Sequence, residues 1–151
     1  MDKKYQLKYL TEKFYEEYGS KNYPEIEQKT DRPYMVFLVN IDNNTYAIPF
    51  RTNVKHKACY KFKTSSRDTK SSTGLDYSKA VIVNSEKYIG QSATIDNKEY
   101  LELSKKYYFI IKQFKTYVQG YMKYVKGEAN EFEAKKYKFS TLQYFHKELN
   151  L

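Results

Sequence analysis

The stretch YMVFLVNIDNNTYAIPF (residues 34–50) contains two runs rich in β-branched and aromatic residues, separated by the polar triplet DNN (42–44). β-branched and aromatic side chains favour strands because they fit a pleated, half-buried surface. Asp and Asn favour turns because their short polar side chains bond to the neighbouring backbone and tolerate left-handed angles. The pattern predicts a β-hairpin with strands at 34–41 and 45–50.

Shorter elements are expected on both sides of this hairpin. A helix should occupy TEKFYEEYG, with Thr11 as its N-cap and Gly19 at its end. The polar stretch at 20–33 and the Ser/Thr/Lys-rich stretch at 63–74 are predicted to be loops. Further strands are expected at 5–10, 57–62, 79–84 and 92–96.

The second half of the chain has helical periodicity. Large apolar and aromatic residues recur at intervals of three and four, which is the stripe that one face of a helix buries. We expect a long helix from Asn97 to about Lys126, bent or interrupted at Gly120, and a final helix at 140–149 with Ser140 as its N-cap. The stripe consists of Leu103, Tyr107, Ile110, Phe114, Tyr117, Tyr121 and Tyr124.

Length and composition are typical of one globular domain. The 151 residues are 40% hydrophobic and 30% charged, so we expect a single domain over 1–151 with a real core. Strands followed by helices predict an α+β fold. The only cysteine, Cys59, cannot form an internal disulfide, and the first residues lack the apolar region of a signal peptide. We therefore expect a cytoplasmic protein without a membrane span.

Positive charge is concentrated in two segments. The chain carries a net charge of +9. Residues 51–70 hold seven cations against one acid, and residues 103–126 hold six lysines and no acid, so each segment contributes +6. Such clusters favour a polyanionic partner, either a nucleic acid or an acidic membrane surface. The chain also has 18 tyrosines, whose rings can pack half-buried or stack on bases.

The segment PFRTNVKHK (49–57) ends the hairpin and combines hydroxyl, imidazole and ammonium groups. A loop that only reversed the chain would use Gly, Pro, Asn or Asp. Arg51 and Lys55 can neutralise phosphate charge, and Thr52 can bind a phosphate oxygen or a 2′-hydroxyl. His56, among cations, should stay neutral and serve as a base or an RNA contact. These groups suit metal-free RNA cleavage by the 2′-hydroxyl, and they also suit phosphate binding without chemistry.

Other kinds of site find little support in the sequence. The P-loop, dinucleotide-binding and HExxH motifs are absent. One cysteine and two histidines cannot form a standard zinc cluster, and the carboxylates show no metal-binding pattern. We expect no metal and no cofactor. Cys59 alternates within the strand at 57–62 and is expected to be a small core residue.

The order of these features resembles the toxins of type III toxin–antitoxin systems, the ToxN and AbiQ family, and is most similar to its CptN and TenpN branches. The similarity covers nearly the whole chain and is best defined at 46–57, 80–83 and 139–142. It implies a compact, strongly curved antiparallel sheet or barrel of the MazF/Kid type with added helices. It also implies a metal-independent, sequence-selective endoribonuclease that leaves 2′,3′-cyclic phosphate and 5′-hydroxyl ends.

The resemblance further implies a partner. A repeated pseudoknot RNA would act as antitoxin, would be cut from its precursor by the toxin, and would assemble with it into a closed protein–RNA oligomer. The biological role would be phage defence by abortive infection, or plasmid maintenance. The ToxN motif is Pro-Leu-Thr-Ser-Pro-Lys, of which Thr52 keeps a hydroxyl and Lys55 the cation, one residue later. Arg51 and His56 are additions to that motif.

The candidate catalytic residues are therefore Thr52, Lys55, Arg51 and His56. Tyr9 and Tyr34 are further candidates, for which core packing is the alternative. Two rival functions remain open: a non-catalytic RNA- or DNA-binding module, and a binder of membrane surfaces or acidic proteins. The candidate RNA-binding residues are Asn53, Lys57, Lys61, Lys63, Ser65, Ser66, Arg67, Lys112 and Lys115.

Overall fold

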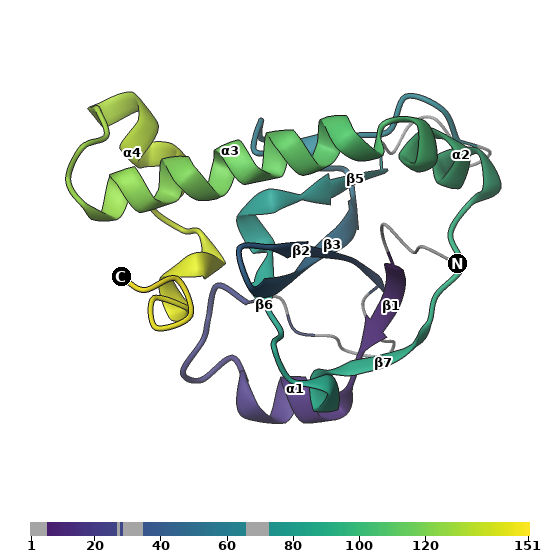
Figure 1. Ribbon diagram of the computed structural model, residues 1–151, viewed down its shortest axis with the longest axis horizontal. Coiled ribbons are helices and arrows are strands. Elements are labelled where there is room, and N and C mark those ends of the chain that lie inside the picture. The colour runs from purple at the N-terminus through teal and green to yellow at the C-terminus, as the bar shows by residue number, and fades with distance from the viewer. Residues whose placement is uncertain (1–5, 27, 29–34, 66–72) are drawn as a thin grey trace.

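The computed structural model describes residues 6–26, 28, 35–65 and 73–151. These residues form the α+β fold that the sequence predicts, with a seven-stranded antiparallel sheet and four α-helices (Figure 1). The strands are β1 (Gln6–Leu10), β2 (Met35–Ile41), β3 (Asn44–Thr52), β4 (Cys59–Lys61), β5 (Thr73–Asp76), β6 (Val81–Ile82) and β7 (Ile89–Ser92). The helices are α1 (Glu12–Glu17), α2 (Asn97–Lys105), α3 (Tyr107–Val125) and α4 (Glu131–Tyr137).

The sheet is centred on the long strand β3. The strand order is β4-β5-β3-β2-β1-β7. Strand β5 pairs with residues 50–52 of β3, and β6 pairs with Tyr46 and Ala47 of the same strand. The described strands do not close into a barrel, because β4 and β7 form the two ends of this path. Within the described residues, no helix is both long enough and apolar enough to cross a bilayer.

The predicted hairpin is formed by β2 and β3, with a turn of two residues rather than three. Asp42 and Asn43 have φ angles of 50° and 70°. Positive φ at both central positions defines a type I′ turn, whose twist matches that of the flanking strands. Asn44 already belongs to β3, where it pairs with Ile41. Its side-chain amide donates to the Glu148 carbonyl at 3.0 Å and ties the hairpin tip to the end of the chain.

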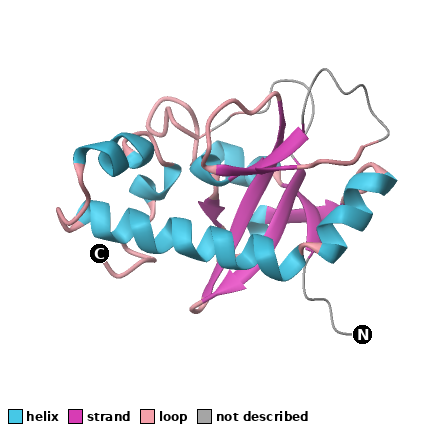
Figure 2. Cartoon of the chain, turned by 90° about the horizontal axis from the view of Figure 1, so that it is seen from above, coloured by secondary structure: helices cyan, strands magenta, loops and turns pink. Residues whose placement is uncertain are grey.

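The long helix expected from Asn97 is divided at Lys106. This residue has φ −99° and ψ 11° and separates α2 from α3. The prediction of one continuous helix was wrong at this point, because the stripe of apolar residues continues in phase across the kink. Figure 2 shows α3 running across the strands. The stripe is buried at Leu103, Ile110, Phe114, Tyr117 and Tyr121, and half-buried at Tyr107 and Tyr124.

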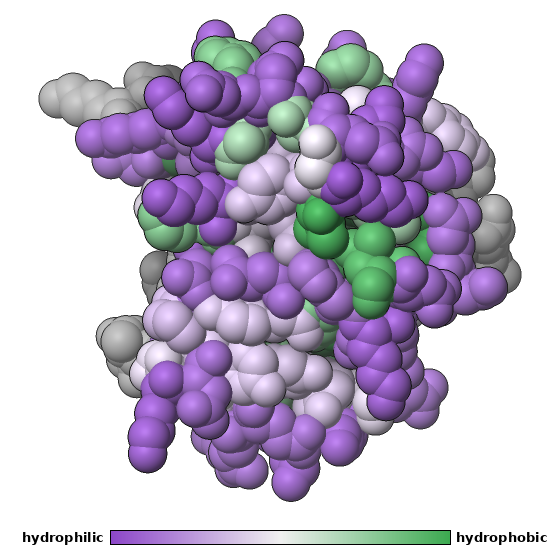
Figure 3. Space-filling model, turned by 90° about the vertical axis from the view of Figure 1, so that its left-hand side faces the viewer, coloured by the Kyte–Doolittle hydropathy of each residue, from purple (hydrophilic) through white to green (hydrophobic). Residues whose placement is uncertain are grey.

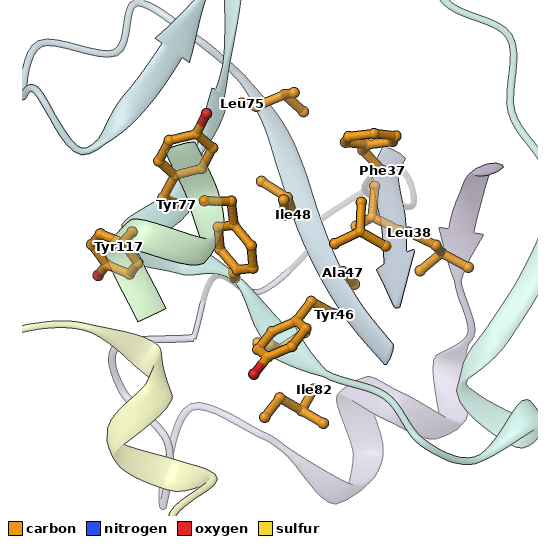
Figure 4. Close-up of a cluster of buried hydrophobic side chains, with 14 of the residues drawn as sticks. Phe37, Leu38, Tyr46, Ala47, Ile48, Leu75, Tyr77, Ile82 and Tyr117 are labelled. Atoms are coloured by element: carbon orange, nitrogen blue, oxygen red, sulfur yellow. The ribbon is translucent and has the colours of Figure 1, made fainter. Parts of the chain in front are cut away.

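Both faces of the hairpin are buried, which explains why β2 reads as a continuous apolar run. Tyr46 and Ile48 lie on the face that α3 covers, and the Tyr46 ring centroid is 5.2 Å from that of Phe114 (Figure 4). Ala47 faces the other way and lines a small cavity together with Phe14 of α1. A strand that is covered on both faces has apolar residues at successive positions instead of alternating ones.

Gly120 does not bend or interrupt α3, contrary to the prediction. The helix continues through it to Val125. A Cβ at position 120 would overlap the hydroxyl of Tyr137 in α4, so glycine is needed there for close packing of the two helices. The sequence analysis missed α4, whose N-cap Asn130 accepts a hydrogen bond from the Glu133 amide at 2.8 Å.

Strand β5 is not among the predicted elements, since the loop expected at 63–74 takes in its first two residues, Thr73 and Gly74. Its second residue, Gly74, has low strand propensity. Glycine is nevertheless required here, since a Cβ would lie 2.7 Å from the Tyr60 carbonyl oxygen of β4. The last strand, β7, occupies Ile89–Ser92 instead of the predicted 92–96, where the chain already leads into Asp96, the N-cap of α2.

The helix predicted at 140–149 is reduced to a 3₁₀ turn at Thr141–Tyr144. Ser140 caps this turn as predicted, because its hydroxyl accepts a hydrogen bond from the Leu142 amide at 3.3 Å. The Thr141 hydroxyl donates to the carbonyls of Ser78 and Ala80. These contacts fix the segment against the stretch of chain that leads into β6.

Candidate functional site

A buried carboxylate at the end of β5 organises the segment that follows β3. The side chain of Asp76 has no exposed surface. Its Oδ2 accepts a hydrogen bond from Arg51 Nη1 at 2.7 Å. Its Oδ1 accepts hydrogen bonds from the Ser78 amide at 3.0 Å and from the Ser78 hydroxyl at 2.6 Å. The Nε2 atom of His56 lies 3.0 Å from the same Oδ1.

Strand register explains why Arg51 and Asp76 meet. Arg51 pairs with Gly74, two residues before Asp76 on β5. Side chains two apart on a strand share a face, so Asp76 projects on the same side of the sheet as Arg51. Asp76 is also the N-cap of the 3₁₀ turn Tyr77–Lys79, which brings the Ser78 amide to its carboxylate.

Asp76 is ionised at neutral pH. Burial raises the pKa of this carboxyl, but the hydrogen bonds from His56, Ser78 and Arg51 outweigh burial and lower the pKa to about 2. The Arg51 guanidinium therefore lies beside a permanent negative charge. We call Arg51, His56, Asp76 and Ser78 the Asp76 cluster.

Both nitrogens of the His56 ring are engaged. Nδ1 accepts a hydrogen bond from the Ala58 amide at 3.1 Å, which assigns the proton to Nε2. Nε2 faces Asp76 and lies 3.3 Å from the Ser78 hydroxyl oxygen. In this arrangement a neutral His56 has an N–H, and not a lone pair, at Nε2. The sequence instead predicts a base or an RNA contact at this position.

The other predicted residues of this loop are exposed. Thr52 follows Arg51 in β3, so the two side chains project from opposite faces of the strand. Asn53 has a φ angle of 62° and begins the turn out of β3. Lys55 and Lys57 are exposed and form no ion pair with a carboxylate in the described part of the chain.

A second cation lies on the same face of the sheet as Arg51. Lys61 of β4 pairs with Gly74, which pairs in turn with Arg51. The register therefore places Lys61 and Arg51 on either side of a residue without a side chain. Lys63, after β4, is also exposed.

Two buried carboxylates of α2 hold the segment after β4. Glu102 accepts hydrogen bonds from the Tyr60 hydroxyl at 2.5 Å and from the amides of Lys63 and Thr64 at 2.9 and 2.7 Å. The Ser65 hydroxyl donates to Glu99 at 2.6 Å. Ser65, a predicted RNA contact, therefore also has a structural partner. Burial raises the pKa of Glu102, but the hydrogen bonds from Tyr60, Lys63 and Thr64 hold it below its usual range.

We expect the Glu102→Gln substitution to increase local opening of the segment after β4 that Glu102 binds. An amide in place of the carboxylate turns an N–H group toward donors that need an acceptor, which costs about 1–3 kcal/mol of unfolding free energy. Hydrogen exchange at the Lys63 and Thr64 amides should become faster, while exchange in the hairpin strands stays slow. Unchanged exchange at both amides would show that Glu102 does not hold the segment.

Some of the remaining predicted residues belong to the described part of the chain, and others lie outside it. Lys112 and Lys115 are exposed on α3, and Tyr9 is half-buried in β1. Ser66, Arg67 and Tyr34 lie outside the described residues.

The sequence analysis missed Asp76, Ser78, Glu99 and Glu102. The pair Asp76–Ser78 has the spacing of a side chain that caps its own turn, which is a local signal. That signal predicts the turn but not the contacts with Arg51 and His56. Glu99 and Glu102 look like ordinary solvated helix residues in sequence, and only the folded structure buries them.

Cys59 is buried, as predicted. Its thiol donates to the His56 carbonyl at 3.2 Å, and burial raises the pKa of the thiol. The thiol therefore stays protonated at neutral pH and is a packing group. Across the described residues, no group of three or more His, Cys, Asp or Glu side chains gathers in a way that could hold a metal ion.

Comparison of the chain with protein-family models, with curated proteins and with solved structures gave no match. The fold and the site define the class of protein: a small α+β domain in which a hydroxyl-bearing basic loop lies beside the buried Asp76 and its partners Arg51, His56 and Ser78.

Proposed function

We propose that this protein is a metal-independent endoribonuclease of the type III toxin class that its sequence resembles. The observation that carries the proposal is the convergence of Arg51 and His56 on the ionised Asp76, in a loop whose exposed Lys55 and Lys57 form no ion pair with described carboxylates. Cations without carboxylate partners are available for phosphate. An imidazole oriented by a carboxylate is a recurring element of proton-transfer sites.

Metal-free RNA cleavage makes three demands on a site. The 2′-oxygen gives up its proton to solvent and attacks the phosphorus, the pentavalent intermediate carries extra negative charge, and the 5′-oxygen leaves with a proton. Lys55 supplies the positive charge for the intermediate, and Thr52 orients the attacking hydroxyl. The Nε2–H of His56 faces Asp76, so proton transfer to the leaving oxygen requires this N–H to turn from Asp76 to the substrate, and the ring then regains a proton from solvent. The products are 2′,3′-cyclic phosphate and 5′-hydroxyl ends.

The toxin class adds an RNA partner and a cellular role to this proposal. A repeated pseudoknot RNA would occupy the basic surface, be processed from its precursor by the enzyme, and form a closed protein–RNA oligomer in the cytoplasm. The proposed role is phage defence or plasmid maintenance. The class also implies that the open seven-stranded sheet is strongly curved in the manner of MazF and Kid.

A second function is favoured by the geometry of His56. Because Nδ1 accepts from the Ala58 amide and Nε2 faces Asp76, the ring can be a purely structural link between the loop after β3 and the end of β5. The protein would then be an RNA- or DNA-binding module that holds phosphates with the same lysines and does no chemistry.

One experiment separates these functions. Purified protein, stripped of bound nucleic acid, is incubated with end-labelled RNA in EDTA, and the products and their termini are resolved. Cleavage to cyclic-phosphate ends is the expected result. Tight, salt-dependent binding without cleavage would favour the binding module, and neither binding nor cleavage would overturn both. Extraction and sequencing of any small RNA that copurifies tests the antitoxin.

A further inference from the structure

Large apolar side chains are exposed where α2 meets α3. Tyr108 is 67% exposed, Phe109 53%, Leu101 52% and Tyr100 41%. We call these four residues the junction patch. Tyr108 and Phe109 are successive residues of α3. Exposed apolar side chains close to one another are a common sign of a binding site, because covering them with a partner recovers hydrophobic free energy.

The junction patch lies beside the edge strand of the sheet. The Phe109 ring centroid is 6.2 Å from that of Tyr60 in β4, and β4 is one end of the strand order. Glu102 of α2 binds the amides of Lys63 and Thr64, just after the same strand. The exposed Lys63 therefore lies next to α2 along this edge, whereas Lys61 follows Tyr60 and projects from the other face of β4.

The surroundings of the patch are positively charged. The Lys106 ammonium lies 5.9 Å from the Phe109 ring centroid. Lys112 and Lys115 follow Tyr108 by about one and two helical turns, on the same side of α3. No acid occurs between residues 103 and 126. The nearest acids of α2, Glu99 and Glu102, are buried.

Two other described aromatic side chains are strongly exposed. Phe139 is 62% exposed, and the Lys138 ammonium lies 5.5 Å from its ring centroid, but it has no exposed aromatic neighbour in the chain. Phe132 of α4 is 82% exposed, but it lies between Glu131 and Glu133. The face of the molecule that bears α4 and the chain end is largely hydrophilic, with scattered hydrophobic groups (Figure 3). Two exposed rings at successive positions, Tyr108 and Phe109, and a long stretch without acids therefore coincide at the junction patch.

We propose that the junction patch is a stacking platform for unpaired bases of single-stranded RNA, with the neighbouring lysines holding the backbone. Base faces stack on aromatic rings while phosphates take the cations, which is how sequence-tolerant single-strand sites are built. A duplex hides its base faces and cannot use such a platform. The inference rests on the proposed function in naming RNA, and it adds a contact surface outside the Asp76 cluster that requires unpaired bases.

A single introduced fluorophore tests the platform, because the chain contains no Trp. The fluorescence of the Phe109→Trp variant should be quenched by a single-stranded RNA oligonucleotide over the concentration range in which the RNA binds. The same sequence as a duplex should quench it much less. The Phe132→Trp variant is the matched control, with an exposed ring on α4, and should show no quenching.

A double variant measures how much the two rings contribute to RNA affinity. Tyr108→Leu combined with Phe109→Leu keeps apolar volume and removes both aromatic faces. Affinity for single-stranded RNA should fall at least about five-fold per ring removed, while affinity for duplex RNA stays within about two-fold. Circular dichroism of the variant should match that of the unsubstituted protein.

The outcomes distinguish this inference from the proposed function. Cleavage of RNA without quenching and without loss of affinity in the leucine variant would overturn the platform and leave the enzyme. Quenching by single-stranded RNA without any cleavage would keep the platform and favour the binding module. Quenching by vesicles of anionic lipid but not by RNA would assign the patch to a membrane surface and overturn the proposal.

Discussion

Lys55→Ala is expected to lower the rate of RNA cleavage by about 10²–10³-fold, because it removes the cation assigned to the pentavalent intermediate. The protein should remain folded, since Lys55 is exposed and forms no ion pair with the described carboxylates. Loss of activity therefore reports on chemistry and not on stability. The measurement is the single-turnover cleavage rate of an end-labelled RNA in EDTA, alongside thermal unfolding of the same samples.

The matched control for this variant is Lys123→Ala, which removes an exposed lysine from the last turn of α3. It changes the net charge equally and should alter the cleavage rate only a few-fold through weaker long-range attraction. Lys55→Arg should retain part of the activity, because it keeps the charge but changes its geometry. If Lys55→Ala and Thr52→Ala both cleave at the unsubstituted rate, the site lies elsewhere on the molecule.

Asp76→Ala is expected to be the most destabilising single substitution in the described part of the site. It removes the carboxylate that Arg51 Nη1, the His56 Nε2–H and the Ser78 amide share as an acceptor. Removal of one partner from a buried charged pair costs about 3–5 kcal/mol of unfolding free energy. Urea unfolding at neutral pH measures this loss.

The isosteric Asp76→Asn variant separates the charge from the shape of the side chain. It should cost less than the alanine variant, because one amide oxygen can still accept hydrogen bonds. Glu86→Ala removes an exposed carboxylate and serves as the control, with an expected change within about 0.5 kcal/mol. An unfolding free energy of Asp76→Ala equal to that of the unsubstituted protein would contradict the central role of this carboxylate.

The stabilisation by Asp76 should also depend on pH with a definite sign. The folded-state pKa of about 2 lies below the value of ~3.9 for an unfolded chain. The contribution is therefore fully present above about pH 5 and is lost as the pH falls toward 2, with a total of roughly 2–3 kcal/mol. The difference in unfolding free energy between the unsubstituted protein and Asp76→Asn should shrink over that window. A constant difference would show that the carboxylate is not stabilised in its ionised form.

Much of the secondary structure could be predicted from the sequence alone, because turns, caps and helix stripes depend on residues close together in the chain. The type I′ turn follows from Asp42 and Asn43, two residues that tolerate positive φ. The buried stripe of α3 follows from spacings of three and four, and the Ser140 cap follows from its hydroxyl. The same local chemistry made the loop at 49–57 a candidate phosphate site, a prediction that the cleavage assay will test.

The tertiary structure decided whatever depends on residues far apart in the chain. Gly74 looks like a loop residue until β4 and β5 approach so closely that no other residue fits. Asp76 and Glu102 acquire their importance from partners 25 and 42 positions away, Arg51 and Tyr60. Capping, turn and helix-stripe patterns involve residues a few positions apart. Helix and strand propensities describe one residue type without its neighbours in the folded structure. Strand register and burial are set by the whole core, and they alone place Arg51, His56 and Asp76 together.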